Sequence, residues 1–144
     1  MRTTVPIMAA LLALAGCGER DAPVPSAQVR LAAVPGRPAA GYFTLRIEGD
    51  RGALLSVRSP QAGRIELHET MTHGNMSSMR ALERVPVRDG ETLSFVPAGR
   101  HLMLYDLAPT LVAGGGMTLV LHFERGADVR IVAEIVPTGG DVDH

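Results

Sequence analysis

Short apolar or alternating segments, separated by turn residues, run through most of this chain. No segment of convincing length shows the 3.6-residue period of an amphipathic helix. Of the intervening stretches, "EGDRG" and "VRDGE" combine glycine with polar residues and "VAGGG" is rich in glycine, which is typical of turns between strands. The pattern predicts strands at residues 28–33, 42–48, 53–58, 64–70, 76–82, 92–96, 101–107, 117–124 and 129–136.

Eight or nine short strands at this spacing predict an antiparallel β-sandwich or barrel. The segment 117–124 illustrates the alternation, because Leu119, Leu121 and Phe123 fall on one face of the expected strand. His122 falls on the other face, and we expect it to be an ordinary solvent-facing residue.

The size and composition favour one domain with a modest core. The chain has 144 residues and a mass of 15.2 kDa. Its apolar fraction is 46%, but aromatic residues make up only 3% and tryptophan is absent, so Val, Leu, Ala and Met must fill the core. The formal net charge of -1 argues against a polycationic nucleic-acid-binding protein.

The first residues have the features of an export signal. Arg2 precedes an apolar run over residues 5–14, which is too short to span a bilayer as a helix. "LAGC", ending at Cys17, resembles a bacterial lipobox, in which cleavage before the cysteine leaves a lipid-modified N-terminus. The alternative is an ordinary leader with an incidental cysteine. We expect a signal peptide at 1–16 and anchoring at Cys17 on the periplasmic side of a bacterial membrane.

We expect three further parts after the signal peptide. Residues 17–26, containing "GERDAPVPS", are polar and proline-containing, and we expect a tether there. We expect the β-sandwich at 27–136 and a flexible tail at 137–144. Removal of the leader takes away one basic residue, which leaves 13 basic and 15 acidic residues and a net charge of -2.

Cys17 is the only cysteine in the chain. The domain therefore has no means of forming an intrachain disulfide, a CxxC redox pair or a thiolate metal site. Its chemistry must depend on histidine, methionine, carboxylates and hydroxyls. No Ser/His/Asp order, phosphate loop or carboxylate pair stands out, so we do not expect an enzyme.

Histidine and methionine are concentrated in two places. "RHLML" puts His101 and Met103 two residues apart on one expected strand, so both project from the same face. "ELHETMTHGNMSSMR" suggests a hairpin that carries His68 and Met79. If the two turn residues are 73 and 74, His68 lies opposite Met79. If they are 74 and 75, His68 lies opposite Ala81. We favour the first register, because Gly74 then supplies the positive φ at the second turn position.

Two imidazoles and two thioethers would form a soft donor set. Thioethers favour Cu(I), whereas zinc sites use thiolate, imidazole and carboxylate. A blue-copper centre is disfavoured because the domain lacks the required cysteine. A single methionine in a β-protein is nevertheless more often a core filler, and a single histidine is usually not a ligand. A β-sandwich interaction module without metal, in which these residues are incidental, is the alternative.

The spacing His-x10-Met-x21-His-x-Met is met in full by His68, Met79, His101 and Met103. It resembles the H(M)x10Mx21HxM signature of the periplasmic copper chaperones called PCu(A)C, and the likeness extends over about residues 28–136. The resemblance implies an all-β, cupredoxin-like antiparallel Greek-key β-sandwich in which these four residues bind Cu(I). It also implies a protein that passes copper toward the copper A site of cytochrome c oxidase, with an oxidase subunit or a Sco-type protein as partner, and we expect a monomer.

Other residues of the expected hairpin lie outside this spacing. Met71, His73 and Met76 are expected in a flexible loop that could bind a second copper ion, although an exposed turn with incidental methionines is the alternative. Glu66 is expected to share a face with His68, where it could orient the imidazole.

Overall fold

The computed structural model describes residues 26–138 and contains ten strands in this part of the chain. No helix in the described part is long and apolar enough to cross a membrane. The strands are β1 (Ser26–Arg30), β2 (Ala39–Arg46), β3 (Ala53–Arg58), β4 (Ala62–His73), β5 (Met76–Leu82), β6 (Val85–Pro86), β7 (Thr92–Phe95), β8 (Arg100–Leu107), β9 (Gly116–Phe123) and β10 (Val129–Val136).

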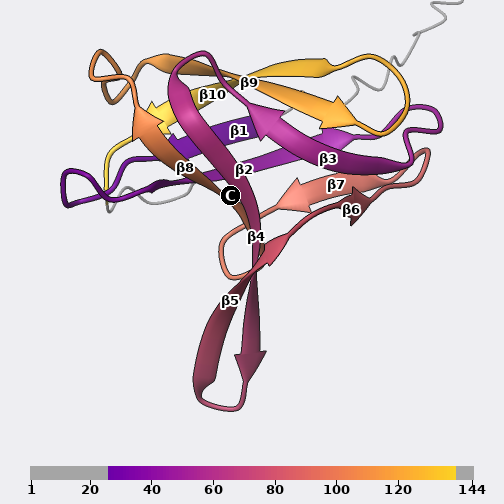
Figure 1. The fold of residues 1–144 in the computed structure, drawn as a ribbon, viewed down its shortest axis with the longest axis horizontal. Helices are drawn as coiled ribbons and strands as arrows, with labels where there is room; N and C mark the ends of the chain where they lie inside the picture. Colours follow the sequence, from indigo (N-terminus) through magenta and orange to yellow (C-terminus); the bar gives the residue numbers. More distant parts are fainter. Residues whose placement is uncertain (1–25, 139–144) are drawn as a thin grey trace, which may run out of the picture.

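The strands form a curved sheet that folds around one core (Figure 1). Its order is β5-β4-β8-β2-β1-β10-β9-β3-β6, and β7 pairs with the remaining part of β2. Every pairing is antiparallel except that of β1 with β10, in which Gln28 lies opposite Glu134. The expected all-β, single-domain fold is confirmed.

Alternation along the strands produces the core. On β9, Leu119, Leu121 and Phe123 are buried, whereas His122 is exposed, as the sequence predicted. Two of the few aromatic residues pack together in the core: the rings of Phe43 and Phe95 stack with centroids 4.6 Å apart. Such a stack contributes about 0.5–1.5 kcal/mol beyond the apolar area it buries.

The strand positions agree well with the hydrophobic pattern. The ranges 53–58, 76–82 and 129–136 were predicted with the bounds that the structure shows. Other bounds differ: β4 continues past the predicted end to His73, and β1 and β2 both begin and end before their predicted bounds. The two-residue strand β6 was not predicted, because it is too short for an alternation to be visible and contains a proline.

The β4–β5 hairpin extends away from the rest of the molecule (Figure 1). Its turn residues are Gly74 and Asn75, since His73 lies opposite Met76. The preferred register was therefore wrong: His68 lies opposite Ala81. Gly74 has a φ of 59° at the first turn position, as in a type II′ turn, whose twist matches that of the flanking strands.

Several predictions fall on residues outside the described range. These are the signal peptide at 1–16, the lipidation of Cys17, most of the tether and the end of the tail, including His144. They stay predictions.

Candidate metal centre

Strands β5, β4 and β8 lie side by side and carry all four residues of the spacing motif. On β4 and β8, His68 lies directly opposite His101, and Glu66 lies directly opposite Met103. Opposed residues of antiparallel strands project from the same face of the sheet. The structure thus places His68, His101 and Met103 on one face of the β4–β8 pair.

Met79 reaches this face from the other side of β4. It lies opposite Thr70, and Thr70 is on the same face as His68. Met79 is thus a diagonal neighbour of His68, at a Cα separation of about 7–8 Å, which a long thioether side chain can bridge. It is 62% exposed, so it is the most accessible of the four residues.

His101 is the only buried polar or charged side chain in the described part of the chain, with 7% of its surface exposed. Its Nδ1 lies 3.1 Å from the carbonyl oxygen of Gly99. A carbonyl only accepts, so Nδ1 carries the hydrogen. In the neutral ring this leaves the lone pair of Nε2 as the metal donor.

His68 uses its ring nitrogens in the opposite way. Its Nε2 lies 2.8 Å from Oε2 of Glu66, and the carboxylate accepts the hydrogen. The neutral ring therefore offers Nδ1 as its donor. The rings of His68 and His101 are 5.9 Å apart between centroids and tilted by 41°.

Glu66 is held by three side chains on the same face. Besides the His68 ring, Arg64 forms an ion pair with Oε1 at 3.0 Å, and the Tyr105 hydroxyl donates to Oε2 at 3.4 Å. The hydrogen bond from His68, together with the charge of Arg64, holds the pKa of the Glu66 carboxyl below its ordinary value. Glu66 and His68 share a face, as their two-residue spacing predicted, and the carboxylate contacts the ring.

The other groups that support the histidines were not predicted from the sequence. The two-residue spacing of Arg64, Glu66 and His68 would have placed Arg64 on this face. Tyr105 and the Gly99 carbonyl could not have been found in this way, because their positions depend on the pairing of β4 with β8 and on the turn before it.

The opposite face of β4 and β8 fixes the strands to the core. Leu67, Leu102 and Leu104 alternate with the polar residues and are almost completely buried. On the neighbouring strand β2, Gly41 lies so close to β8 that an added Cβ would stand 3.0 Å from the Cβ of Leu102. The position of His101 and Met103 is thus set by packing on the other side of their strand.

Met71, His73 and Met76 do not lie in a loop, which corrects the prediction. Met71 and His73 belong to β4, and Met76 begins β5. Met71 and His73 alternate with His68 and Thr70, and Met76 lies opposite His73, so all three are on the other face of the hairpin. In the described residues, no three His, Cys, Asp or Glu side chains gather to hold a metal ion. Any metal site there would therefore need thioether donors.

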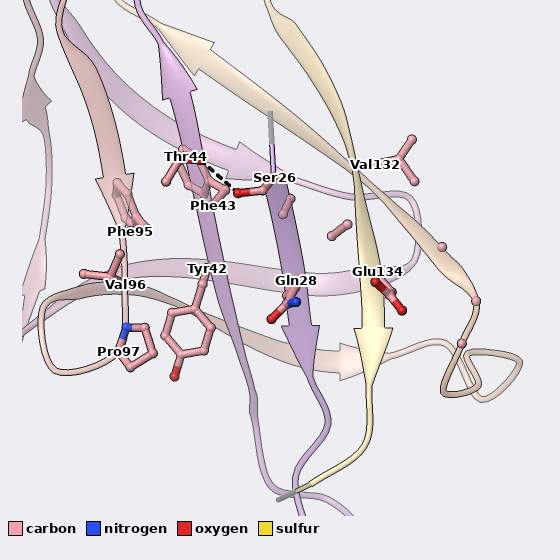
Figure 2. A pocket seen from close by; sticks show the side chains of 15 residues that line it. Ser26, Gln28, Tyr42, Phe43, Thr44, Phe95, Val96, Pro97, Val132 and Glu134 are labelled. Carbon is pink, nitrogen blue, oxygen red and sulfur yellow. Dashed lines mark hydrogen bonds between the residues drawn. The ribbon is translucent and has the colours of Figure 1, made fainter. Parts of the chain in front are cut away.

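A separate hollow of about 730 Å³ lies across β1, β2 and β10 (Figure 2). The hollow is lined by one polar side chain from each of these strands, Gln28, Tyr42 and Glu134. Gln28 lies opposite both Tyr42 and Glu134. Ser26 and Thr44 are joined by a hydroxyl hydrogen bond of 2.9 Å at one side. None of the four motif residues lines this hollow, and Tyr42 and Glu134 are its only ionisable described residues.

Comparison with solved structures supports the fold. The chain is similar to a solution structure titled CuI-DR1885 from Deinococcus radiodurans, with 26% identity, a TM-score of 0.62 and coverage of 85% of each chain. It is similar to the apo PmoF2 PCuAC domain, with 18% identity, a TM-score of 0.63 and coverage of 81% of this chain and 90% of that one. The copper-bound PCuAC domain from PmoF2 gives 20% identity, a TM-score of 0.58 and coverage of 78% and 91%. The expected cupredoxin-like sandwich is confirmed by these neighbours.

Sequence comparison finds relatives among bacterial proteins. A protein described as "Putative lipoprotein Lxx21020" of Leifsonia xyli subsp. xyli is 29% identical over 90 residues, which cover 60% of this chain and 53% of the relative. A Rickettsia prowazekii protein, RP573, is 29% identical over 85 residues, covering 58% and 47%. The chain spans about half the length of these relatives. The model of the family described as "Putative lipoprotein LpqE-like" matches residues 23–135, and the chain belongs to this family.

Proposed function

We propose that this protein is an exported, lipid-anchored carrier of Cu(I), with His68, Met79, His101 and Met103 as the ligands. The observation that carries the proposal is the opposed pair of histidines on β4 and β8, with Met103 on the same face beside them. Met79 completes the donor set from β5. Two imidazoles and two thioethers are neutral donors that suit a soft monovalent ion.

The hydrogen bonds of the histidines support this function. The Gly99 carbonyl and the Glu66 carboxylate each accept a ring hydrogen, which directs the remaining nitrogen of each imidazole away from these groups. Partners of this kind commonly orient metal-binding histidines and raise their basicity. Glu66 acts as a positioning residue for His68, and its negative charge would also favour a cation nearby.

The solved neighbours give independent support. Several are PCuAC domains, and the titles of two state a bound copper or Cu(I). The family description and the Leifsonia relative both name a lipoprotein, in agreement with anchoring at Cys17. We propose the periplasmic side of the membrane as the location.

We further propose that the protein acts without catalysis and passes its ion to another protein. Thiolates compete well against thioethers for Cu(I), so an acceptor with cysteines could remove the ion. By its resemblance to the PCu(A)C proteins, the acceptor would be a cytochrome c oxidase subunit or a Sco-type protein during assembly of the copper A site.

X-ray absorption at the copper edge tests the ligand set. The protein, produced from residue 18 onward so that no thiol remains, is loaded with one equivalent of Cu(I). We expect a spectrum with both nitrogen and sulfur neighbours. In His68→Asn/His101→Asn, the nitrogen contribution should fall and the affinity for Cu(I) should drop at least tenfold. Absence of bound copper in the unmodified protein would contradict the proposal and favour a metal-free interaction module.

A further inference from the structure

The tip of the β4–β5 hairpin presents a second group of soft donors on the face opposite to His68 and Met79. His73 and Met76 flank the two turn residues and lie directly opposite each other. Met71 lies two residues before His73 and opposite Ser78, so it shares their face. These three side chains are therefore neighbours, separated from the first donor set by the hairpin backbone.

Packing does not account for these residues. Methionines in β-proteins usually fill gaps in a core, yet Met76 is 78% exposed at the end of a hairpin that projects from the molecule (Figure 1). His73 is exposed as well, and within residues 26–138 its ring makes no hydrogen bond. Met71 is half-buried, whereas His73 and Met76 are exposed and available to an ion.

The distances between the strands allow one ion to reach all three side chains. The pair that flanks a two-residue hairpin turn has a Cα separation of about 5.5 Å, and the diagonal from Met71 to Met76 is about 7–8 Å. Methionine has three rotatable bonds beyond Cα, which lets a sulfur swing over this range.

The two charged residues next to these donors neutralise each other. The neighbouring pair toward the body of the molecule is Glu69 and Arg80, whose carboxylate and guanidinium lie 2.7 Å apart. Arg80 is therefore neutralised by its partner rather than left to repel a cation. A neutral donor set of one imidazole and two thioethers suits Cu(I), as in the first site.

We propose that Met71, His73 and Met76 form a second Cu(I) site at the hairpin tip, on the face opposite to His68 and Met79. It has one donor fewer than the first site and is more exposed, so it binds more weakly. The second site goes beyond the proposed function and does not depend on the first, because the two donor sets share no residue and face opposite sides of the hairpin.

Native mass spectrometry with Cu(I) buffered by a chelator tests the stoichiometry. We expect two ions on the unmodified protein and one on Met71→Leu/His73→Asn/Met76→Leu. His68→Asn/His101→Asn should keep the ion at the tip. Thr72→Val changes the same strand but the other face, and it should keep two ions. The three tip residues do not belong to the core, so their substitution should leave the circular dichroism spectrum unchanged.

Methyl NMR on His68→Asn/His101→Asn assigns the ion to its ligands. With Ag(I) as a redox-stable substitute, the methyl groups of Met71 and Met76 should shift, whereas that of the buried Met117 should not. Adding His73→Asn should weaken Ag(I) binding at least tenfold.

The two proposals fail in different ways. Unshifted Met71 and Met76 methyl groups, or an unchanged copper count after the triple substitution at the tip, would overturn the second site. An unchanged copper count in His68→Asn/His101→Asn would overturn the first site alone.

Discussion

His68 and His101 lie directly opposite each other on neighbouring antiparallel strands, with ring centroids 5.9 Å apart. His68 donates from Nε2 and His101 from Nδ1, so the two rings are oriented by different kinds of acceptor.

Substitution of the proposed ligands should weaken copper binding selectively. His101→Ala and Met79→Ala each remove one donor and should raise the Kd for Cu(I) about tenfold or more, measured by competition with a colorimetric chelator. His122→Ala is the control, because His122 lies on β9 and pairs with Asp128 at 2.8 Å. Equal effects at the three positions would mean that the ligand assignment is wrong.

The tautomers of the two histidines should differ in the metal-free protein. Long-range ¹H–¹⁵N correlation spectra at neutral pH should show hydrogen on Nε2 of His68 and on Nδ1 of His101, because a carboxylate and a carbonyl accept these hydrogens. The same hydrogen position in both rings would contradict the geometry described for the site.

Glu66 should act through the orientation of His68. Glu66→Ala removes the acceptor and should weaken Cu(I) binding by about tenfold, with a mixture of His68 tautomers in the same NMR spectrum. Glu66→Gln retains an acceptor oxygen and should recover most of the affinity. If both variants bind copper as tightly as the unmodified protein, Glu66 has no positioning role.

Gly41 should be required for the packing of β8. Gly41→Ala places a methyl group 3.0 Å from the Cβ of buried Leu102, which cannot move away without a shift of the backbone. We expect the free energy of unfolding to fall by about 1–3 kcal/mol, measured by urea denaturation.

Gly116→Ala provides a matched control in another strand. Its added methyl group would stand 3.1 Å from Cγ1 of Val132, whose side chain is mostly exposed and can rotate. The destabilisation should therefore be smaller than that of Gly41→Ala, and the reverse order would contradict the packing argument.

The ion pair of Asp50 and Arg125 should make stability depend on pH in the acid range. The hydrogen bond from Arg125 at 2.5 Å lowers the pKa of Asp50 below its ordinary value. The stabilisation is therefore present above about pH 3.9, the usual pKa in the unfolded chain, and is lost as the pH falls through the lower pKa of the folded state.

Urea denaturation between pH 7 and pH 2 checks this prediction. The unmodified protein should be slightly more stable than Asp50→Asn at neutral pH, and the difference should vanish at the lowest pH. Both residues are exposed, so 1 M salt should reduce the difference at pH 7. A difference that grows on acidification would contradict the assigned direction.

Much of the fold could be predicted from the sequence because its strands are bounded by clear turn residues. The range 53–58 lies between the glycine-containing turn "EGDRG" and "SPQAG", and the structure confirms both ends. The parallel pairing of β1 with β10 could not be predicted, since it joins strands about 100 residues apart through contacts that no local pattern records.

The hairpin register shows where local reasoning failed and why the face assignment remained correct. Gly74 is the second turn residue in one register and the first in the other, and glycine can adopt a positive φ at both positions. The sequence alone therefore did not decide between the two registers. Both registers differ by two residues, however, and a shift of two leaves every side chain on the same face. Met79 is therefore on the face of His68 although its opposite residue is Thr70.

The positions of the two proposed methionine ligands have a consequence for the order of ligand exchange. Met79 lies toward the hairpin tip and is 62% exposed, whereas Met103 lies toward the body of the molecule, on the far side of the histidine pair. If the four residues hold copper, an approaching thiolate would replace Met79 first, while both imidazoles still bind the ion. Copper would then pass through a shared intermediate and would not be released into water.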